Sequence, residues 1–588
     1  MLVAVFLLGA LGQLMGAVGF SWATCRGLKK SGLGHDLITG FAIGHILESL
    51  TITALSCSEF LPRRLLILWF GVKILLFLGF LITKSPRGDL FATLRGHPLP
   101  CLWTAALLSA ASVPTSNYDA FTAHFAVARL FIEAGQLPLR GDYGYLHELP
   151  LAAHMWFLPP LACGLEGGAN MASAVFAAAL PLLLAREWGA RIALASFLVL
   201  LSMPQFQLIS TNPMPEPAAV FYALFGLARL RRCFRAGARA DREILLAGLA
   251  WAFMAGLKPP LILFPCAWFA AALWLSRQGK ITKKELVGCA VCAAACGGLW
   301  YFRNALLHHN PFYPYAFAPE TRALIPPEHR PPVGSVTMRT WAGYFQTVFL
   351  DPRWRLSLGP WPLILLPLLP WVAKKRGTFA FVAALLVAGY LVTFAFTPFK
   401  NRYFIPYLTL LLPWMGAFLA RRPRPARWLL ALTAGWSVLS FVPYFLQPFA
   451  VLAKGQDREA YYAAKFPMYP AVRKLNELPA AGKVLFVATP VYWLEHDHVL
   501  SIYSETALDY TRLSDLDEFK QRLKQLGVRY VAYDHDNIYG MQEHPDPWYA
   551  ARRYQAGRCA ALLDALFADP SLRLISKDTG LWLGEITP

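Results

Sequence analysis

The sequence predicts a polytopic α-helical membrane protein with about 13 to 14 spans, followed by a C-terminal α/β domain. Three observations predict this fold class. Of the 588 residues, 56% are hydrophobic and 15% are charged, and the mean hydropathy is +0.42, above that of soluble proteins with polar surfaces. Long apolar runs recur along most of the chain. Beyond residue 446 the composition changes, because that region holds 18 of the 35 acidic residues.

The apolar runs are long enough, or nearly so, to cross about 30 Å of hydrocarbon at 1.5 Å per residue. The first run lacks the basic start of a secretory signal and is expected to be retained as a span. The expected spans are residues 2–24, 37–57, 65–83, 99–115, 170–185, 192–209, 217–230, 244–257, 259–276, 286–302, 360–373, 378–396, 404–420 and 428–446.

The formal net charge of +20 is explained by topology rather than by binding of nucleic acid. Alternate loops between the expected spans hold 25 Lys or Arg, whereas the short intervening loops hold five. Because basic loops stay in the cytoplasm, the N-terminus, the long loops 116–168 and 303–359 and the chain after 446 are expected outside. Arg63 and Arg64 are the main exceptions.

The first long loop contains two apolar stretches of its own. In residues 121–134, Phe121, Phe125 and Phe131 lie among polar side chains, which suits an amphipathic helix in the membrane interface. The run 149–163 contains Pro159 and Pro160 and fits an interfacial or re-entrant element better than a span. Cys289, Cys292 and Cys296 lie in an apolar run and are expected to be small packing residues rather than a metal or redox site.

The region after residue 446 has the pattern of a soluble α/β domain. Residues 483–489, 499–504 and 528–534 read as strands, as do the last two apolar stretches near 572–578 and 581–586. The stretch 514–527 reads as a helix that begins at a Ser cap and stops at Gly527, and a further helix is expected around 550–568.

Ionisable residues gather at or near the expected outer face, where charges cost several kcal/mol unless they are paired or face water. Several have simpler interpretations: Lys400 and Arg402 as snorkelling side chains, Lys258 as a turn residue and Asp119 as a helix cap. Glu133, Asp142 and Glu148 are typical of solvated loop carboxylates, and His124 and His147 of interfacial polar residues. The candidates are Asp119, His124, Glu133, Asp142, His147, Glu148, Glu216, Lys258, Arg303, Lys400 and Arg402.

Carboxylates and cations together at the lipid headgroup level suit transfer of a sugar from a lipid phosphate. The leaving phosphate develops negative charge, which Arg and Lys stabilise in a partly desolvated site. The acceptor hydroxyl loses a proton as it attacks, and an aspartate such as Asp119 can accept it as general base.

In the same order along the chain, several motifs resemble a known family, the GT-C fold glycosyltransferases that use polyprenyl-phosphate sugars. That family includes protein O-mannosyltransferases and the lipid A aminoarabinose transferase. The matching segments are "DAFTAH" at 119–124, "STNPMPEP" at 210–217, "GLKPP" at 256–260, "FRNALLHHNPFYP" at 302–314 and "NRYFIP" at 401–406. The chain departs from the family in Ala123, where an aromatic residue is common, in Glu216, where Asp is commoner, and in about three extra N-terminal spans.

The resemblance implies inverting transfer of one sugar on the extracytoplasmic face of a bacterial inner membrane. Asp119 then corresponds to the base, and Glu216 to a second acidic contact to the acceptor or a metal. Arg402, Lys258 and Arg303 correspond to donor-phosphate contacts, and His124, Asp142, His147 and Glu148 remain candidate substrate contacts. A divalent metal is possible, and the acceptor is a glycan, a lipid or a protein.

The expected organisation has three parts: extra N-terminal helices over 1–98, a catalytic membrane core over 99–446, and an extracytoplasmic α/β domain over 447–588. Two other functions remain open. A lipid or sugar transporter or flippase has many spans with buried charges, but the sequence shows no internal repeat. An oligosaccharide ligase would work on the same face with a diphosphate-linked glycan.

Overall fold

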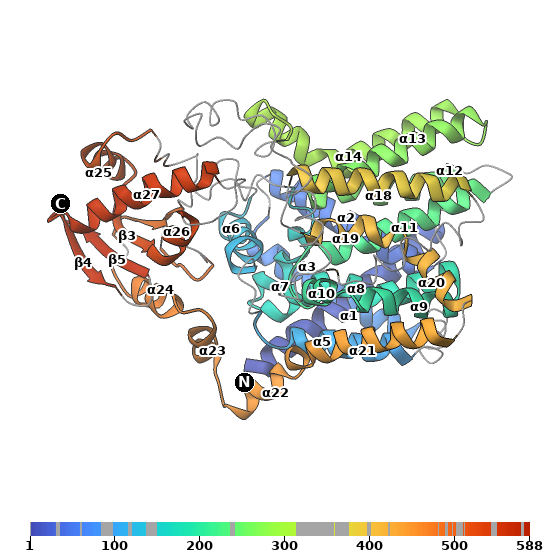
Figure 1. Ribbon diagram of the computed structural model, residues 1–588, viewed down its shortest axis with the longest axis horizontal. Helices are drawn as coiled ribbons and strands as arrows, with labels where there is room; N and C mark the ends of the chain where they lie inside the picture. Colours follow the sequence, from blue (N-terminus) through green and yellow to red (C-terminus); the bar gives the residue numbers. More distant parts are fainter. Residues whose placement is uncertain are drawn as a thin grey trace.

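The structure is a computed structural model of the 588-residue chain. It describes residues 2–30, 36–58, 61–83, 98–115, 120–136, 150–235, 241–312, 358, 376–396, 401–421, 424–479, 481–487, 492–496, 498–500, 508, 510, 512–542, 550–577 and 581–587. Figure 1 shows a bundle of helices beside a smaller region that contains the sheet.

The expected spans correspond to helices, except for 360–373, which lies outside the described residues. The long helices are α1 (Leu2–Lys30), α2 (Leu37–Cys57), α3 (Arg63–Ile82), α5 (Pro98–Ala111), α8 (Glu166–Trp188), α11 (Glu216–Arg235), α12 (Asp241–Leu257), α13 (Leu263–Arg277), α14 (Lys283–His308), α18 (Arg376–Phe396) and α21 (Arg424–Phe445). Within the described ranges, six helices are long and apolar enough to cross a membrane, or up to seven if a bent pair counts as one span.

Three expected spans are interrupted. Residues 192–209 form α9 (Ala190–Leu201) and α10 (Pro204–Ser210), which are bent by 91° at their junction. Pro204 begins the second helix, where its missing N–H costs nothing. The other interrupted spans are η4 (Pro259–Ile262) with α13, and α19 (Ile405–Thr409) with α20 (Leu412–Arg421).

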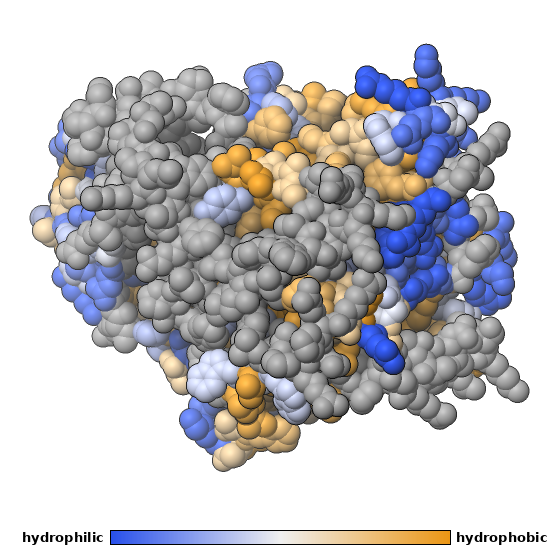
Figure 2. All heavy atoms as spheres, turned by 45° about the vertical axis from the view of Figure 1, so that its right-hand side comes forward, coloured by the Kyte–Doolittle hydropathy of each residue, from blue (hydrophilic) through white to orange (hydrophobic). Residues whose placement is uncertain are grey.

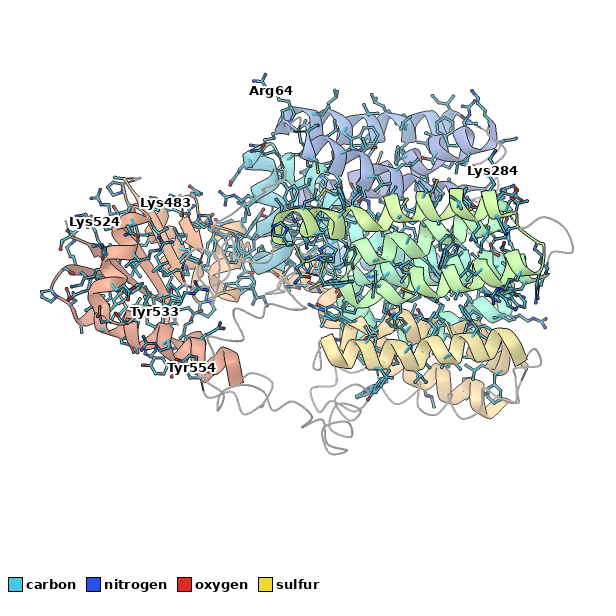
Figure 3. All side chains as sticks on the ribbon, turned by 90° about the horizontal axis from the view of Figure 1, so that it is seen from above. Arg64, Lys284, Lys483, Lys524, Tyr533 and Tyr554 are labelled. Atoms are coloured by element: carbon cyan, nitrogen blue, oxygen red, sulfur yellow. The ribbon has the colours of Figure 1, made fainter. Side chains whose placement is uncertain are left out.

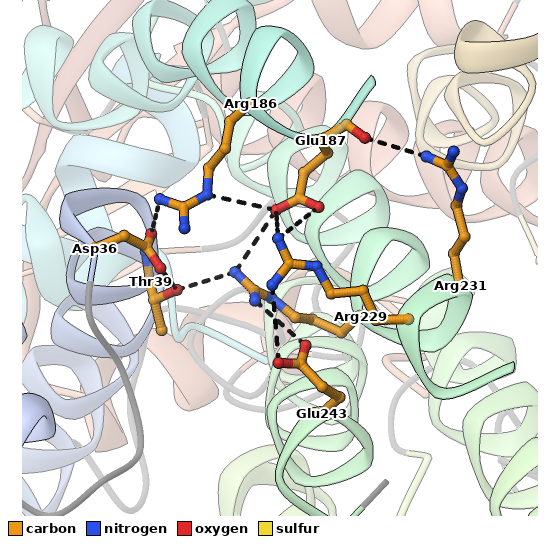
Figure 4. Close-up of polar contacts among 8 residues, drawn as sticks. Asp36, Thr39, Arg186, Glu187, Arg229, Arg231 and Glu243 are labelled. Atoms are coloured by element: carbon orange, nitrogen blue, oxygen red, sulfur yellow. Dashed lines mark hydrogen bonds and ion pairs between the residues drawn. The ribbon is translucent and has the colours of Figure 1, made fainter. Parts of the chain in front are cut away.

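Charged side chains from four helices meet at one end of the bundle, which we call the arginine end (Figure 4). Glu187 at the end of α8 lies 2.8 Å from Arg232 on α11, and Arg229 lies 3.3 Å from Glu243 on α12. Asp36, which caps α2, lies 2.6 Å from Arg186. Three loops that the sequence predicts to be cytoplasmic therefore converge at one end. Figure 2 shows hydrophilic side chains there, next to the hydrophobic surface of the helices.

The opposite end of the bundle, which we call the site end, faces the C-terminal region (Figure 1). It carries the π-helical turn η1 (Ala120–His124), α6 (Phe125–Ala134), η3 (His154–Trp156) and α7 (Leu158–Ala162). Phe121, Phe125 and Phe131 are fully buried within the protein, so the apolar face of 121–134 packs against other residues of the chain. That the segment lies in the membrane interface stays a prediction. The described part of the run 149–163, residues 150–163, forms only the short buried elements η3 and α7, which agrees with the expectation that the run is not a span.

The C-terminal region contains a five-stranded mixed sheet in the order β2-β1-β3-β5-β4. The first three strands in this order run parallel, and β5 runs antiparallel to both of its neighbours, β3 and β4. Ala532 on β3 pairs with Phe486 on β1 and with Leu583 on β5. The strands are β1 (Lys483–Val487), β2 (His498–Leu500), β3 (Val528–Asp534), β4 (Leu572–Ser576) and β5 (Leu581–Ile586). The expected strand at 499–504 lies only partly inside the described residues.

Helices cover the sheet and connect it to the bundle. Leu485 and Val531 on one face belong to the same buried core as Phe519 on α25 and Leu563 on α27. The expected Ser cap of α25 is wrong: the Asp515 side chain accepts from the Glu518 N–H at 2.9 Å. The remaining helices are α22 (Gln447–Ala453), α23 (Arg458–Lys465), α24 (Tyr469–Asn476), α25 (Leu516–Gln525), α26 (His535–Gln542) and α27 (Ala550–Ala568).

Candidate functional site

Three of the sequence-predicted site residues form one charged cluster at the site end. Arg402 Nε lies 3.2 Å from Glu216 Oε1, and Lys258 Nζ lies 3.7 Å from the same oxygen. The Glu216 side chain is 2% exposed, whereas those of Lys258 and Arg402 are 16% and 12% exposed. The carboxylate therefore lies behind two cations that retain access to solvent or a ligand.

Local sequence explains how each charge reaches this cluster. Glu216 is the first residue of α11, where a carboxylate is favoured by the positive end of the helix dipole. Lys258 follows α12 with an extended backbone (φ −158°, ψ 138°), as expected of a residue that precedes a proline. Arg402 lies in the short helix η7 (Asn401–Tyr403), and its inward pairing argues against snorkelling.

Tyr403 connects the two cations. The Lys258 ammonium donates to the Tyr403 hydroxyl at 3.2 Å and lies 4.6 Å from the centre of the ring. The Arg402 guanidinium lies 5.4 Å from the same ring centre. Because a tyrosine ring attracts cations over its face, Tyr403 helps to hold the two positive charges together.

A histidine pair lies next to the cluster. His124 Nδ1 and His154 Nε2 are 2.9 Å apart, and the two rings stack with centres 4.9 Å apart. Burial lowers the pKa of His154 to about 3, and the charge of Lys258 acts in the same direction. His154 is therefore neutral at physiological pH and adds no positive charge to the site.

The chain on both sides of the predicted base reaches this region. Before it, the Thr115 hydroxyl donates to Asn212 Oδ1 at 2.5 Å, four residues before Glu216. After it, His124 pairs with His154, as described above. Asp119 itself lies outside the described residues, as do Asp142, His147, Glu148 and Lys400.

Arg303 occupies a different place from the one expected. It lies on α14, which continues to His308, so the second long loop begins later than the expected residue 303. The Arg303 side chain is buried, and its Nη1 lies 3.4 Å from Asn304 Oδ1. Arg303 is thus a helix residue rather than a loop residue.

Sequence reasoning missed the contributions of His154, Tyr403 and Asn212. A histidine inside the apolar run 149–163 was a usable signal, because ionisable groups in such runs need a partner. The roles of Tyr403 and Asn212 depend on contacts between distant segments, which no local pattern reveals. Within the described ranges, no three His, Cys, Asp or Glu side chains are grouped as metal ligands would be.

Two cations beside a histidine pair whose His154 is neutral can bind a phosphate group. Lysine supplies a point charge, and arginine supplies donors in a fork that matches phosphate oxygens. Because Glu216 neutralises only one of the two positive charges, the cluster of Glu216, Lys258 and Arg402 keeps a net positive charge.

No protein-family model matches the sequence, and no curated protein matches it. Solved structures are similar in fold. The structure of ArnT from Cupriavidus metallidurans bound to undecaprenyl phosphate has a TM-score of 0.51 and 15% identity, covering 85% of this chain and 98% of that chain. The apo structure of the same protein has a TM-score of 0.48 and 13% identity, covering 78% and 92%.

The oligosaccharyltransferase of Archaeoglobus fulgidus, tethered to an acceptor peptide, is less similar. Its TM-score is 0.41 with 12% identity, covering 78% of this chain and 71% of that chain. The likeness to undecaprenyl-phosphate-bound ArnT spans nearly the whole of both chains. The chain has the GT-C fold of that membrane glycosyltransferase.

Proposed function

We propose that this protein is a membrane glycosyltransferase that moves a sugar from a polyprenyl-phosphate donor to the hydroxyl of a glycan, lipid or protein acceptor. The observation that carries this proposal is the convergence of Lys258 and Arg402 on the buried Glu216 at the site end of the bundle. The similar fold of ArnT, whose structure holds undecaprenyl phosphate, supports the choice of lipid carrier. The proposal keeps the division of the chain at residues 98 and 446 that the sequence predicts.

The two cations act on the leaving group. As the bond between sugar and phosphate breaks, negative charge grows on the phosphate oxygens, and preorganised cations stabilise it most in a partly desolvated site. Glu216 is better suited to hold Lys258 and Arg402 in place than to contact an acceptor or a metal, because it is buried behind them. We therefore assign Glu216 as a positioning residue.

Asp119 is proposed as the general base. Thr115 and Ala120 are the nearest described residues on either side of Asp119, and both are buried. Thr115 donates to Asn212, and His124 pairs with His154 beside the cation cluster. Consecutive Cα atoms are about 3.8 Å apart, so the Cα atom of Asp119 lies within about 3.8 Å of that of Ala120. The His124–His154 pair lies on the same side and is proposed to contact the substrate.

The proposal places the site end and the C-terminal region outside the cytoplasm of a bacterial inner membrane, because the basic loops lie at the other end. Arg303, Asp142, His147 and Glu148 stay candidate substrate contacts from the sequence. A divalent metal also stays a prediction, to be tested by adding a chelator to the assay below.

The test is release of free polyprenyl phosphate, followed by mass spectrometry, from a panel of polyprenyl-phosphate sugars offered to the purified protein. We expect turnover of one donor class and a donor KM about 10- to 100-fold higher in Arg402→Ala, since a charge-assisted contact contributes about 1.5 to 3 kcal/mol. Asp119→Asn should lower kcat by about 10² to 10⁴-fold. Arg64→Ala is the matched control, an exposed arginine at the same end (Figure 3).

Two outcomes would contradict the proposal. Absence of sugar release from every donor would reject the enzyme, and an equal loss in Arg64→Ala and Arg402→Ala would reject the assigned phosphate site.

One observation favours a transporter as second candidate. Lys73 and Glu48 form a fully buried ion pair at 2.8 Å in the middle of α3 and α2, and Trp69 donates to the same carboxylate at 3.0 Å. Charges at mid-span depth often mark transport pathways. Movement of intact lipid across a proteoliposome membrane without sugar release would support this function.

A further inference from the structure

The segment next to the proposed base is held by an aromatic group from the C-terminal region. Phe121, in the π-helical turn η1, is fully buried. Its ring centre lies 4.5 Å from that of Trp493, 5.4 Å from Tyr462 and 5.2 Å from Phe466. All of these partners come from residues beyond 446. The C-terminal region therefore packs directly onto the residue two positions after Asp119.

The same region also contacts the chain before the proposed base. The Tyr461 hydroxyl donates to the Pro114 carbonyl at 2.9 Å and accepts from Gln447 Nε2 at 2.6 Å. Tyr461 and Tyr462 are neighbours on α23, yet they contact chain segments on opposite sides of residues 116–119. One helical turn of α23 thus bridges the two flanks of the proposed base.

Glu166 anchors this arrangement to the bundle. It is the first residue of α8, is buried, and accepts from Arg458 at 2.5 Å and from Tyr492 at 3.0 Å. The Tyr462 hydroxyl donates to its other carboxylate oxygen. A buried carboxylate with three donors fixes α23 and Tyr492 relative to the membrane helices.

A third attachment comes from α6. Arg129 Nη1 donates to the Tyr492 carbonyl at 2.5 Å, and Arg129 Nε pairs with Glu133 at 2.5 Å. Because α6 continues directly from η1, this contact holds the far side of the π-helical turn. In Figure 1, α6 lies on the side of the bundle that faces the C-terminal region.

We propose that Tyr461, Tyr462, Phe466, Tyr492 and Trp493 form an aromatic clamp that positions the segment carrying Asp119. This inference rests on the proposed function, in which Asp119 is the base. It gives the C-terminal region a role in catalysis without contact to the reacting atoms. Turns of π-helix are rare and recur at functional sites, where they need support from their surroundings.

The mechanism is positional. A general base works only within hydrogen-bond reach of the acceptor hydroxyl, and a displacement of about 1 Å can lower the rate by about 10²-fold. Donor binding depends on Lys258 and Arg402, which pair with Glu216 and lie beside the ring of Tyr403. Loosening the clamp therefore lowers kcat and leaves the donor KM unchanged.

Tyr461→Phe is the most selective test, because it removes one hydroxyl and keeps the ring. Tyr530→Phe is its matched control: Tyr530 is also 1% exposed, and its hydroxyl also donates to a proline carbonyl, that of Pro479, at 3.2 Å. We expect kcat to fall about 10-fold in Tyr461→Phe and to stay unchanged in Tyr530→Phe, with equal donor KM in both. Trp493→Leu should lower kcat more than Tyr461→Phe does. Trp493→Phe keeps an aromatic ring at this position and should retain most of the wild-type kcat.

Hydrogen–deuterium exchange of the peptide covering 114–124 gives a readout that does not depend on activity. Faster exchange in Tyr461→Phe than in Tyr530→Phe supports the clamp even if no donor is turned over, in which case only the proposed function fails. Unchanged exchange together with wild-type kcat in Tyr461→Phe and Trp493→Leu would overturn the clamp.

Discussion

At the scale of single residues, the buried carboxylate of Glu216 determines how the two cations are held. Both cations pair with one oxygen of a side chain that is almost inaccessible to solvent. Removing one partner from a buried ion pair leaves charge without compensation, which costs more than the pair itself contributes. The stability of the site end should therefore be sensitive to this single residue.

Glu216→Gln should lower the free energy of unfolding by about 1 to 3 kcal/mol, because Lys258 and Arg402 lose their counter-ion. Combining it with Arg402→Gln should recover part of the loss, since the second change removes one uncompensated charge. Thermal unfolding of the two single variants and the double variant gives the coupling energy. A fully stable Glu216→Gln variant that has lost turnover would instead indicate a direct role in catalysis.

His154 makes the stability depend on pH in a defined direction. The ordinary pKa of 6.5 applies to the unfolded chain, whereas burial lowers the pKa in the folded protein to about 3. Between these values the unfolded state binds one more proton, so the folded state loses stability as pH falls below about 6.5.

Lowering the pH from 7 to 5 should reduce the contribution of His154 to stability by about 2 kcal/mol. His154→Gln keeps a polar atom near the position of Nε2 but does not titrate, so its melting temperature should fall less over this range. Parallel melting curves of both proteins test the assignment, and identical pH dependence would show that His154 titrates normally.

At the scale of elements, close approach between helices sets the geometry around Lys258. A Cβ added at Gly297 on α14 would lie 2.0 Å from the Ala252 carbonyl oxygen on α12, the helix that ends immediately before Lys258. The Tyr301 hydroxyl donates to the Ala255 carbonyl at 3.0 Å in the same interface. Small residues at such contacts allow membrane helices to pack tightly.

Gly297→Ala should destabilise the protein by about 1 to 3 kcal/mol, because the added methyl group meets a backbone oxygen that cannot move alone. The adjacent Gly298→Ala is the control, since a Cβ there meets nothing within 4 Å. In a helix interior that control should be neutral or stabilising by about 0.5 to 1 kcal/mol. Equal melting temperatures for the two variants would contradict the packing account.

At the scale of the whole molecule, the two ends of the bundle carry different charged groups. The arginine end joins helices through Asp36, Glu187 and Glu243 with their arginine partners (Figure 4). The site end holds the cation cluster and faces the C-terminal region (Figure 1). Arg64 and Lys284 lie at opposite ends in Figure 3, so they report on the orientation of the bundle.

Single cysteines introduced by Arg64→Cys and by Lys524→Cys should react with a membrane-impermeant thiol reagent in intact cells, in a background without the native cysteines. Lys284→Cys should react only after permeabilisation, because the basic loops are expected to stay in the cytoplasm. Labelling at 64 and 284 from the same side would contradict the arrangement of the bundle. Labelling at 284 alone would show that the bundle has the opposite orientation in the membrane.

The sequence by itself determined the helical membrane fold, most helix positions and the charge asymmetry between loops. Apolar length and basic loop residues are local properties, so they could be read without knowing which helices are neighbours. It also identified Glu216, Lys258 and Arg402 as candidates through their positions next to expected spans. The strands of the C-terminal region were predicted from their short apolar runs, and a strand is observed at each of the five positions. The predicted ends of the first and second strands lie outside the described residues.

Only the tertiary structure decided which of these residues act together. Glu216 and Arg402 are far apart in sequence, and their pairing depends on how α11 and η7 pack. For the same reason, the pattern of 121–134 shows an apolar face but not its partner, Tyr492, whose ring centre lies 5.5 Å from that of Phe125. A local sequence pattern predicts whether a side chain needs burial or a partner. Which residue becomes the partner depends on contacts between distant segments, and these form only in the folded chain.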